Sequence, residues 1–271
     1  MPANTNSDMS FLDHLEELRW HLIRSFMAVL VLAVLAFVFK GLVFDTVLLG
    51  PSRPDFLTNR LLCRVADWAQ MPVLCINPVQ LSFQNIQLAG QFTMHIWVAF
   101  IAGATLAFPY IFYEFWRFIR PALYENEVRH SRGAILAASL LFSVGILFAY
   151  FVIAPLSVYF LGSYQVSARV ENIINFGSYV STVSSIVLAT GFMFELPVFI
   201  YFLSKVGLVS TGFLKKYRRH AIVLTLVLAA IITPPDVISQ LLVSLPLLLL
   251  YEGGIIIAAR VERKRAKESN A

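Results

Sequence analysis

Apolar residues gather in long runs along this chain, and most polar residues are confined to the segments between them. The runs cover roughly residues 23–43, 92–111, 133–156, 178–203, 220–233 and 237–257. Because a helix rises about 1.5 Å per residue, each of the first four runs is long enough to cross the ~30 Å hydrocarbon core of a bilayer. The pattern predicts an all-α polytopic membrane protein.

The last two runs are shorter than the others. Residues 221–233 would form only about 20 Å of helix, and the sequence Thr233-Pro-Pro-Asp236 interrupts the chain before the next run. Two interpretations remain, a re-entrant hairpin or two short spans that thin the bilayer around them. We favour two short spans, which gives six transmembrane helices in total.

The composition supports the same class of protein. The chain is 58% hydrophobic and 14% charged, whereas a soluble domain is about half apolar and about a quarter charged. The first 22 residues are polar and acidic, so we expect no cleaved signal peptide. The sequence has no tandem repeat and no long polar linker, and we therefore expect residues 1–271 to form a single membrane domain.

The distribution of positive charge predicts the orientation. With six spans, 16 of the 21 Lys and Arg residues fall on the side of the N-terminus, and the positive-inside rule places that side in the cytoplasm together with the C-terminus. This placement explains the net charge of +5 without nucleic-acid binding. The polar segments are then a cytoplasmic amphipathic segment at 1–22, an outside cap loop at 44–91, a cytoplasmic loop at 109–132 and a basic cytoplasmic tail at 258–271.

The sequence lacks the common motifs of enzymes. It contains no phosphate-binding G-x-x-x-x-G-K-[ST] loop, no H-E-x-x-H zinc motif and no G-x-S-x-G nucleophile elbow. The five histidines are scattered without metal-ligand spacing. We therefore expect no catalytic activity, no cofactor and no metal site.

Both cysteines, Cys63 and Cys75, fall in the outside cap loop. On an oxidising side of the membrane such a pair is able to form a disulfide. The alternative is two free thiols buried in a loop that packs on the membrane face. In either case the pair would stabilise a local cap and carry no chemistry.

One ionisable residue lies deep in an apolar run. Glu195 is about 15 Å from the end of its run near Lys205. An ionised carboxylate at that depth costs several kcal/mol, so the group must be protonated, face water or be paired. It either packs against a neighbouring helix through a hydrogen bond or forms a polar docking point for a partner helix or a substrate route, and we favour docking.

Two acidic patches lie beside predicted span entrances on the cytoplasmic side. They consist of Asp13, Glu16 and Glu17, and of Glu125 and Glu127. Anionic lipid would repel these carboxylates, whereas the planar guanidinium of arginine can meet a carboxylate through two parallel hydrogen bonds. The patches therefore predict recognition of a ligand with two arginines.

The aromatic segment between Phe108 and Glu127 has a simpler alternative for part of its charge. We expect Pro109 and Pro121 to break the helical path and to leave this segment as a loop at the headgroup level. Glu114 and Glu125 are then explained by ordinary surface salt bridges with neighbouring arginines, worth at most about 1 kcal/mol each.

The motifs together resemble those of the TatC family, the multispanning receptor of the twin-arginine translocation system. They occur in order along nearly the whole chain: His14-Leu-Glu-Glu-Leu-Arg19, Phe108-Pro-Tyr, Glu114-x-Trp116-x-Phe118, Pro121-Ala-Leu-Tyr124 with Glu127, Gly145-Ile-x-Phe-Ala-Tyr150 with Pro155, Phe194-Glu-x-Pro-Val198, and Thr233-Pro-Pro-Asp-Val-x-Ser-Gln240 with Pro246 and Glu252.

The resemblance implies six spans in a curved, glove-like wall within the bacterial cytoplasmic (inner) membrane, with both termini cytoplasmic. It implies binding of paired-arginine signal peptides and export of folded proteins driven by the proton-motive force. Implied partners are single-span proteins of the TatA and TatB type, and further copies of the chain within a larger complex. The loop at 109–132 is then the recognition loop.

The resemblance also implies roles for particular residues. The two signal-binding glutamates of the family fall on Glu17 and Glu127, and a loop aromatic associated with them falls on Phe118. The intramembrane glutamate associated with partner-helix docking falls on Glu195, and the acidic residue of the last outside turn falls on Asp236. The cap loop with the two cysteines resembles that of the family poorly, so no roles are carried over there.

Two other classes of function compete with this interpretation. A proton-coupled secondary transporter would use Glu195 as its proton carrier, but such folds usually show internal repeats with broken spans at matching positions, and this sequence shows neither. A passive membrane scaffold would leave the two acidic patches unexplained.

Overall fold

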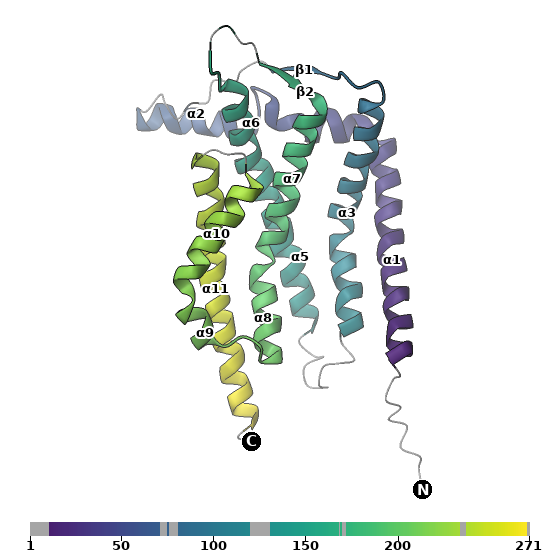
Figure 1. Cartoon of the computed structure of the whole chain (residues 1–271), viewed down its shortest axis with the longest axis vertical. Coiled ribbons are helices and arrows are strands. Elements are labelled where there is room, and N and C mark those ends of the chain that lie inside the picture. Colours follow the sequence, from purple (N-terminus) through teal and green to yellow (C-terminus); the bar gives the residue numbers. More distant parts are fainter. Residues whose placement is uncertain are drawn as a thin grey trace. The chain divides into compact units, whose positions relative to one another are not determined.

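The computed structural model describes residues 11–70, 75, 81–119, 131–167, 169, 172–233 and 237–269. The chain forms two compact units, which are described separately (Figure 1). The first unit comprises Met1–Val38 and Ala99–Ser139, and the second comprises Phe39–Val98 and Leu140–Ala271.

The first unit contains α1 (Phe11–Val38), most of α3 (Gly90–Ile119) and the first turns of α5 (Ser131–Phe148). The predicted amphipathic segment and the first span form one continuous helix from Phe11 onward. Gly103 of α3 packs directly on α1, because a Cβ atom there would lie 2.6 Å from the backbone nitrogen of Ala33. Small residues allow helix backbones to approach closely within a membrane, and this contact sets the two helices side by side.

The expected break at Pro109 is wrong. α3 continues through this proline to Ile119, so the first half of the predicted cytoplasmic loop is helical. Membrane helices tolerate proline because neighbouring groups satisfy the backbone carbonyl that loses its partner. Pro121 lies outside the described residues.

The second unit holds the remaining elements. They are the π-helical turn η1 (Leu42–Leu48), the short η2 (Gly50–Ser52), α2 (Leu57–Ala69), β1 (Ser82–Gln84), the rest of α5, the π-helical turn η5 (Ala149–Ile153), α6 (Ala154–Ser163), β2 (Ile173–Asn175), α7 (Phe176–Phe194), α8 (Leu196–Val206), α9 (Thr211–Lys216), α10 (Arg218–Ile232) and α11 (Val237–Ser269). The strands pair in parallel, with Phe83 opposite Ile174.

Within the described residues, five helical stretches are long and apolar enough to cross a membrane: Leu15–Val38, Gly90–Ile119, Ile135–Ser163, Phe176–Val206 and Ser239–Ala266. They confirm the prediction of a polytopic membrane protein. The fifth predicted span, at 220–233, corresponds to α10, which has 15 residues and therefore extends only about 22 Å. That length is short of the ~30 Å hydrocarbon core, so a sixth full crossing stays a prediction.

The core of the second unit forms around α7. Its buried face carries Val180, Val183 and Ile186, which recur at the three-residue spacing of one helix face. Val180 and Val183 pack with Val158 of α6, and Ile186 packs with Leu247 of α11. The helix begins at Asn175, whose side chain accepts a hydrogen bond from the backbone N–H of Ser178 at 3.2 Å, as is typical of N-caps.

The predicted cap loop is fastened to the helices beneath it. The hydroxyl groups of Tyr150 and Tyr179 donate hydrogen bonds of 2.8 Å to the carbonyl oxygens of Val47 and Leu48. α2 runs across the direction of α7 at the end of the unit that also holds the two strands (Figure 1). A disulfide joins Cys63 of α2 to Cys75.

The disulfide gives a first testable prediction. Closing a loop of this length contributes roughly 3 kcal/mol in the chain-entropy account, so replacing Cys63 and Cys75 together with serine should make residues 63–75 more accessible to protease. Limited proteolysis of the purified protein, with and without reductant, measures this. The serine variant and the reduced wild type should give the same pattern of early cleavage. Equal resistance of oxidised, reduced and variant protein would contradict the prediction.

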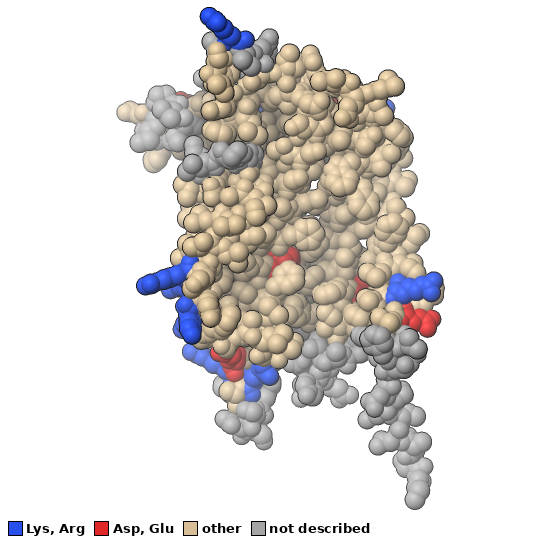
Figure 2. All heavy atoms as spheres, viewed as in Figure 1, with Lys and Arg blue, Asp and Glu red and all other residues tan. Residues whose placement is uncertain are grey.

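The long helix α11 braces the corner between α8 and α9. α8 ends at Gly207, whose φ of +86° favours glycine. The guanidinium of Arg265 donates to the carbonyl of Ser204 at 3.4 Å, and the Glu262 carboxylate accepts from the backbone N–H of Thr211 at 2.7 Å. Figure 2 shows charged atoms gathered on the visible face over α9 and the end of α11, with few along α7.

Candidate functional site

The candidate site of the first unit begins on α1. Glu16 is exposed and Glu17 is about half-buried, with 37% of the Glu17 side chain accessible. Glu17, His21 and Arg24 follow one another at spacings of four and three residues, which places their side chains on one face of the helix. That face meets α3 at Glu114.

A buried contact between an imidazole and a carboxylate joins the two helices. Nδ1 of His21 lies 2.5 Å from Oε2 of Glu114, and the two side chains are 6% and 2% accessible. Nε2 of the same imidazole lies 3.9 Å from Oε1 of Glu17, and the guanidinium of Arg24 lies 3.9 Å from the Glu114 carboxylate. His21 therefore stands between two carboxylates, one buried and one open to solvent.

Phe118 lies beside this pair. Its ring meets the imidazole of His21 edge-on, with centroids 6.1 Å apart and an interplanar angle of 64°. The structure thus brings both Phe118 and Glu17 close to His21. Glu127, Glu125 and Asp236 lie outside the described residues, and so does the side chain of Asp13.

The interpretation of Glu114 as a surface salt bridge is wrong. Because α3 continues past Pro109, Glu114 is carried on a helix and buried against α1. His21 is not among the site residues predicted from the sequence. The available signal was its place four residues after Glu17 in the same helix, since that spacing puts both side chains on one face.

The arrangement is suited to binding a cation. The imidazole and Arg24 balance the buried Glu114 carboxylate, which stabilises a charge that would otherwise be costly to bury. Glu17 keeps free acceptor capacity on its accessible side. A guanidinium that approaches from solvent can therefore meet the Glu17 carboxylate without breaking the pair behind it.

Glu195 marks the junction between α7 and α8 in the second unit. It is the C-cap of α7 and the N-cap of α8, and Pro197 follows at the start of α8, where a missing backbone N–H costs no helical hydrogen bond. Its side chain is 3% exposed and lies against the backbone of Phe142 in α5. Neither carboxyl oxygen makes a hydrogen bond of ordinary geometry with a described residue.

The described residues contain no group of three His, Cys, Asp or Glu side chains able to hold a metal ion. The candidate binding sites are the two constellations described above. One is a half-exposed carboxylate above a buried ion pair, and the other is a carboxyl group enclosed at a helix junction.

Comparisons with known proteins give a consistent family. The sequence model of the family described as Sec-independent protein translocase protein (TatC) matches residues 13–246. The TatC protein of Blattabacterium sp. subsp. Periplaneta americana is 40% identical over 264 residues, which cover 97% of this chain and 99% of the relative. The TatC protein of Aquifex aeolicus is 34% identical over 266 residues, which cover 97% of this chain and 100% of the relative.

Two solved structures agree with these relatives. A crystal structure of the twin arginine translocase receptor TatC has a TM-score of 0.65 at 32% identity and covers 92% of this chain and 99% of its own. A second crystal structure of that receptor, in DDM, has a TM-score of 0.70 at 34% identity and covers 90% of this chain and 99% of its own. The chain therefore belongs to the TatC family of Sec-independent protein translocase proteins, multi-pass membrane components of the machinery of protein transport.

Proposed function

We propose that this chain is the signal-peptide receptor of a twin-arginine translocase. It binds paired-arginine signal peptides at the cytoplasmic side of the bacterial inner membrane and takes part in export of folded proteins driven by the proton-motive force. Related solved structures carry the description twin arginine translocase receptor. The receptor role in this chain rests on its own residues, above all on Glu17.

The single observation that carries the proposal is the position of the Glu17 carboxylate, which is accessible to solvent on a helix held in place by buried contacts. It stands on α1 with 37% of its side chain accessible, above a buried His21–Glu114 pair that fixes α1 against α3. A carboxylate held on a rigid helix loses little freedom when it binds, which favours affinity. Its ligand is an arginine because the planar guanidinium offers two parallel N–H groups.

Glu127 is the proposed partner of Glu17 for the second arginine. Phe118, at the edge of the His21 imidazole, provides an apolar and aromatic surface close to Glu17. A guanidinium can stack on such a ring while its N–H groups meet a carboxylate. The site would then read two adjacent guanidinium groups and discriminate against lysine, which lacks the planar fork.

Photocrosslinking tests the proposal directly. A photoreactive amino acid placed at position 17 or 127 in native membranes should crosslink to a signal peptide with paired arginines and lose that product when both arginines are replaced with lysine. Position 216, at the end of α9 in the second unit, provides the control. Equal crosslinking of both peptides from position 17, or none from positions 17 and 127, would overturn the proposal.

Glu195 is the proposed docking point for a partner helix of the TatA or TatB type. Its carboxyl group is buried and makes no ordinary hydrogen bond with the described residues, so a polar group from a partner helix would satisfy it. Hydrogen bonds between membrane helices contribute about 1–2 kcal/mol.

This role predicts a separable defect. Glu195→Leu should lower co-purification of the partner roughly tenfold, since 1.4 kcal/mol corresponds to that factor, and should leave signal-peptide crosslinking at position 17 unchanged. Ser184→Ala on α7 removes another buried polar group and serves as the matched control. Unchanged co-purification in a well-folded Glu195→Leu protein would exclude the docking role.

A further inference from the structure

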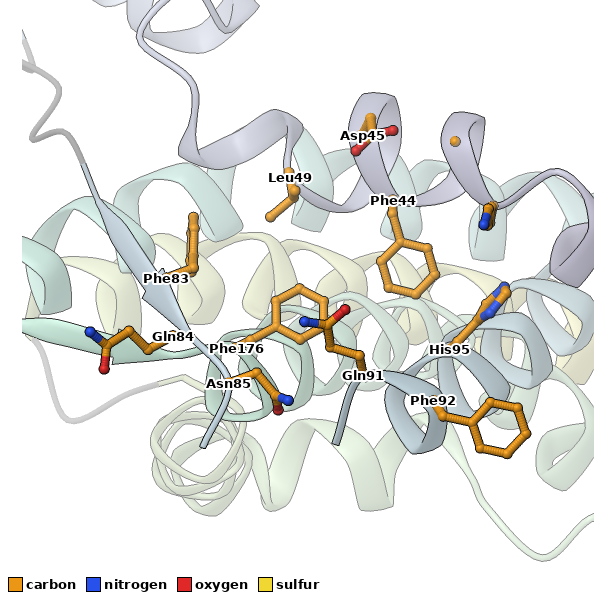
Figure 3. Close-up of a pocket in the computed structure, with 12 residues that line it drawn as sticks. Phe44, Asp45, Leu49, Phe83, Gln84, Asn85, Gln91, Phe92, His95 and Phe176 are labelled. Carbon is orange, nitrogen blue, oxygen red and sulfur yellow. The ribbon is translucent and has the colours of Figure 1, made fainter. Parts of the chain in front are cut away.

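A cavity of about 510 Å³ opens in the second unit, lined by residues of that unit (Figure 3). Its walls come from the segment after α1, from η1, from β1 and from the first turns of α3 and α7. Cavities of roughly 300–1,000 Å³ are typical of sites for small ligands. Neither the receptor role nor partner docking uses this cavity.

A bilayer centred on the spans beside the cavity would place the cavity at the level of the lipid headgroups. The spans that begin at Gly90 and Phe176 have 30 and 31 residues, hence lengths of about 45 Å, which match the whole bilayer with its headgroup layers rather than its hydrocarbon core. Gln91 and Phe176 line the cavity and are among the first residues of these spans. Any occupant therefore has its polar part in the headgroup layer.

The lining carries both signs of charge. Lys40 and Asp45 both border the cavity, both are exposed, and neither side chain forms an ion pair with another described residue. The backbone carbonyl of Asp45, not its carboxylate, accepts the hydrogen bond from Arg53 at 2.5 Å. An ammonium and a carboxylate left open in one cavity complement a ligand that carries an anion and a cation.

The rest of the cavity is lined by aromatic rings and by side-chain amide groups. Figure 3 shows the rings of Phe44 and Phe176 and the amide of Gln91 turned toward the middle of the cavity. Phe92 borders the cavity with 62% exposure, and Ile96, one turn further along α3, is 50% exposed. These two side chains share one face of the helix and form an apolar path from the cavity toward the bilayer interior.

We propose that this cavity binds a phospholipid with a primary-amine headgroup, that is, phosphatidylethanolamine. Lys40 faces the phosphate, Asp45 faces the ammonium, and an acyl chain follows Phe92 and Ile96. A choline headgroup has no N–H to donate to Asp45, and a glycerol headgroup offers neutral hydroxyls in place of the ammonium, so it leaves the charge of that carboxylate without a cation. A free phosphoethanolamine ion would make no use of the apolar path.

Native mass spectrometry of the purified full-length protein tests this proposal. The protein is exchanged into nanodiscs containing equal amounts of dioleoyl phosphatidylethanolamine, phosphatidylcholine and phosphatidylglycerol, released, and scored for retained lipid. We expect phosphatidylethanolamine to be retained preferentially. Removing one charge-assisted contact costs about 1.5–3 kcal/mol, so Lys40→Gln and Asp45→Asn should each lower its retention at least tenfold.

Matched controls lie on α2 outside the cavity lining. Arg64→Gln and Asp67→Asn remove exposed charges from the same loop and should leave retention unchanged. Equal retention of the three lipids, or equal retention by wild type and by both cavity variants, would overturn the proposal. Displacement of the lipid by millimolar soluble phosphoethanolamine would also overturn it, because the headgroup alone would then account for binding.

Discussion

Replacing Glu17 with alanine should weaken binding of a paired-arginine signal peptide by roughly a hundredfold or more. The bidentate contact between a carboxylate and a guanidinium comprises two charge-assisted hydrogen bonds of about 1.5–3 kcal/mol each, and 1.4 kcal/mol corresponds to a factor of ten. The partial exposure of Glu17, 37% of its side chain, places the expected loss at the lower end of that range. Glu17→Asp keeps the charge on a shorter stem and should retain part of the affinity.

Binding of a fluorescent signal peptide to the purified protein in nanodiscs measures this effect. Glu16→Ala is the matched control, because Glu16 is exposed on the same turn of α1 and has no role in the proposed site. Glu127→Ala should produce a loss similar to that of Glu17→Ala. If both alanine variants bind the peptide like the wild type while remaining folded, the acidic site is elsewhere and the receptor proposal fails for these residues.

Replacing Glu114 with alanine should destabilise the protein by about 3–5 kcal/mol, the usual cost of removing one partner of a buried ion pair. His21 would remain buried opposite an empty space, with its Nδ1 no longer 2.5 Å from a carboxylate. The contact between α1 and α3 would weaken, and signal-peptide binding would fall as a secondary effect. Thermal unfolding in detergent and resistance to SDS measure the loss of stability directly.

Two further variants separate charge from packing. Glu114→Gln keeps a hydrogen-bond acceptor for the imidazole and should be less destabilising than Glu114→Ala. His21→Leu combined with Glu114→Leu replaces both partners with apolar groups, which is often close to neutral for buried pairs, and should recover most of the stability. A double variant as unstable as Glu114→Ala would show that the buried pair contributes more than the avoidance of an unpaired group.

The long apolar runs predicted the spans well because burial in lipid demands nearly continuous hydrophobicity, which is visible without knowledge of neighbours. The contact partners of particular side chains could not be predicted in the same way. A helix break at Pro109 would place Glu114 in a surface loop, but the helix continues past this proline. The pairing of His21 with Glu114 joins residues 93 positions apart, and such a contact depends on how α1 packs against α3.

For other residues, the sequence indicated that they were unusual but did not reveal their surroundings. The position of Glu195 in an apolar run marked it as unusual, but its place at the junction of two helices required the structure. The sequence leaves Cys63 and Cys75 compatible with free thiols as well, and their disulfide is evident only from the structure. The cavity near Lys40 could not be predicted at all, because its walls come from five segments spread over more than half the chain.

Because α11 is long, movement of its C-terminal end can be passed to the segments that it contacts. Its 33 residues extend about 50 Å, so the last three turns project beyond the hydrocarbon layer. In those turns, Glu262 and Arg265 form hydrogen bonds with the backbone on either side of Gly207, at Thr211 and Ser204. A force or a bound protein that tilts the C-terminal end of α11 would therefore displace the α8–α9 corner as well. Through α8 this displacement would reach Glu195, the N-cap residue twelve positions before Gly207.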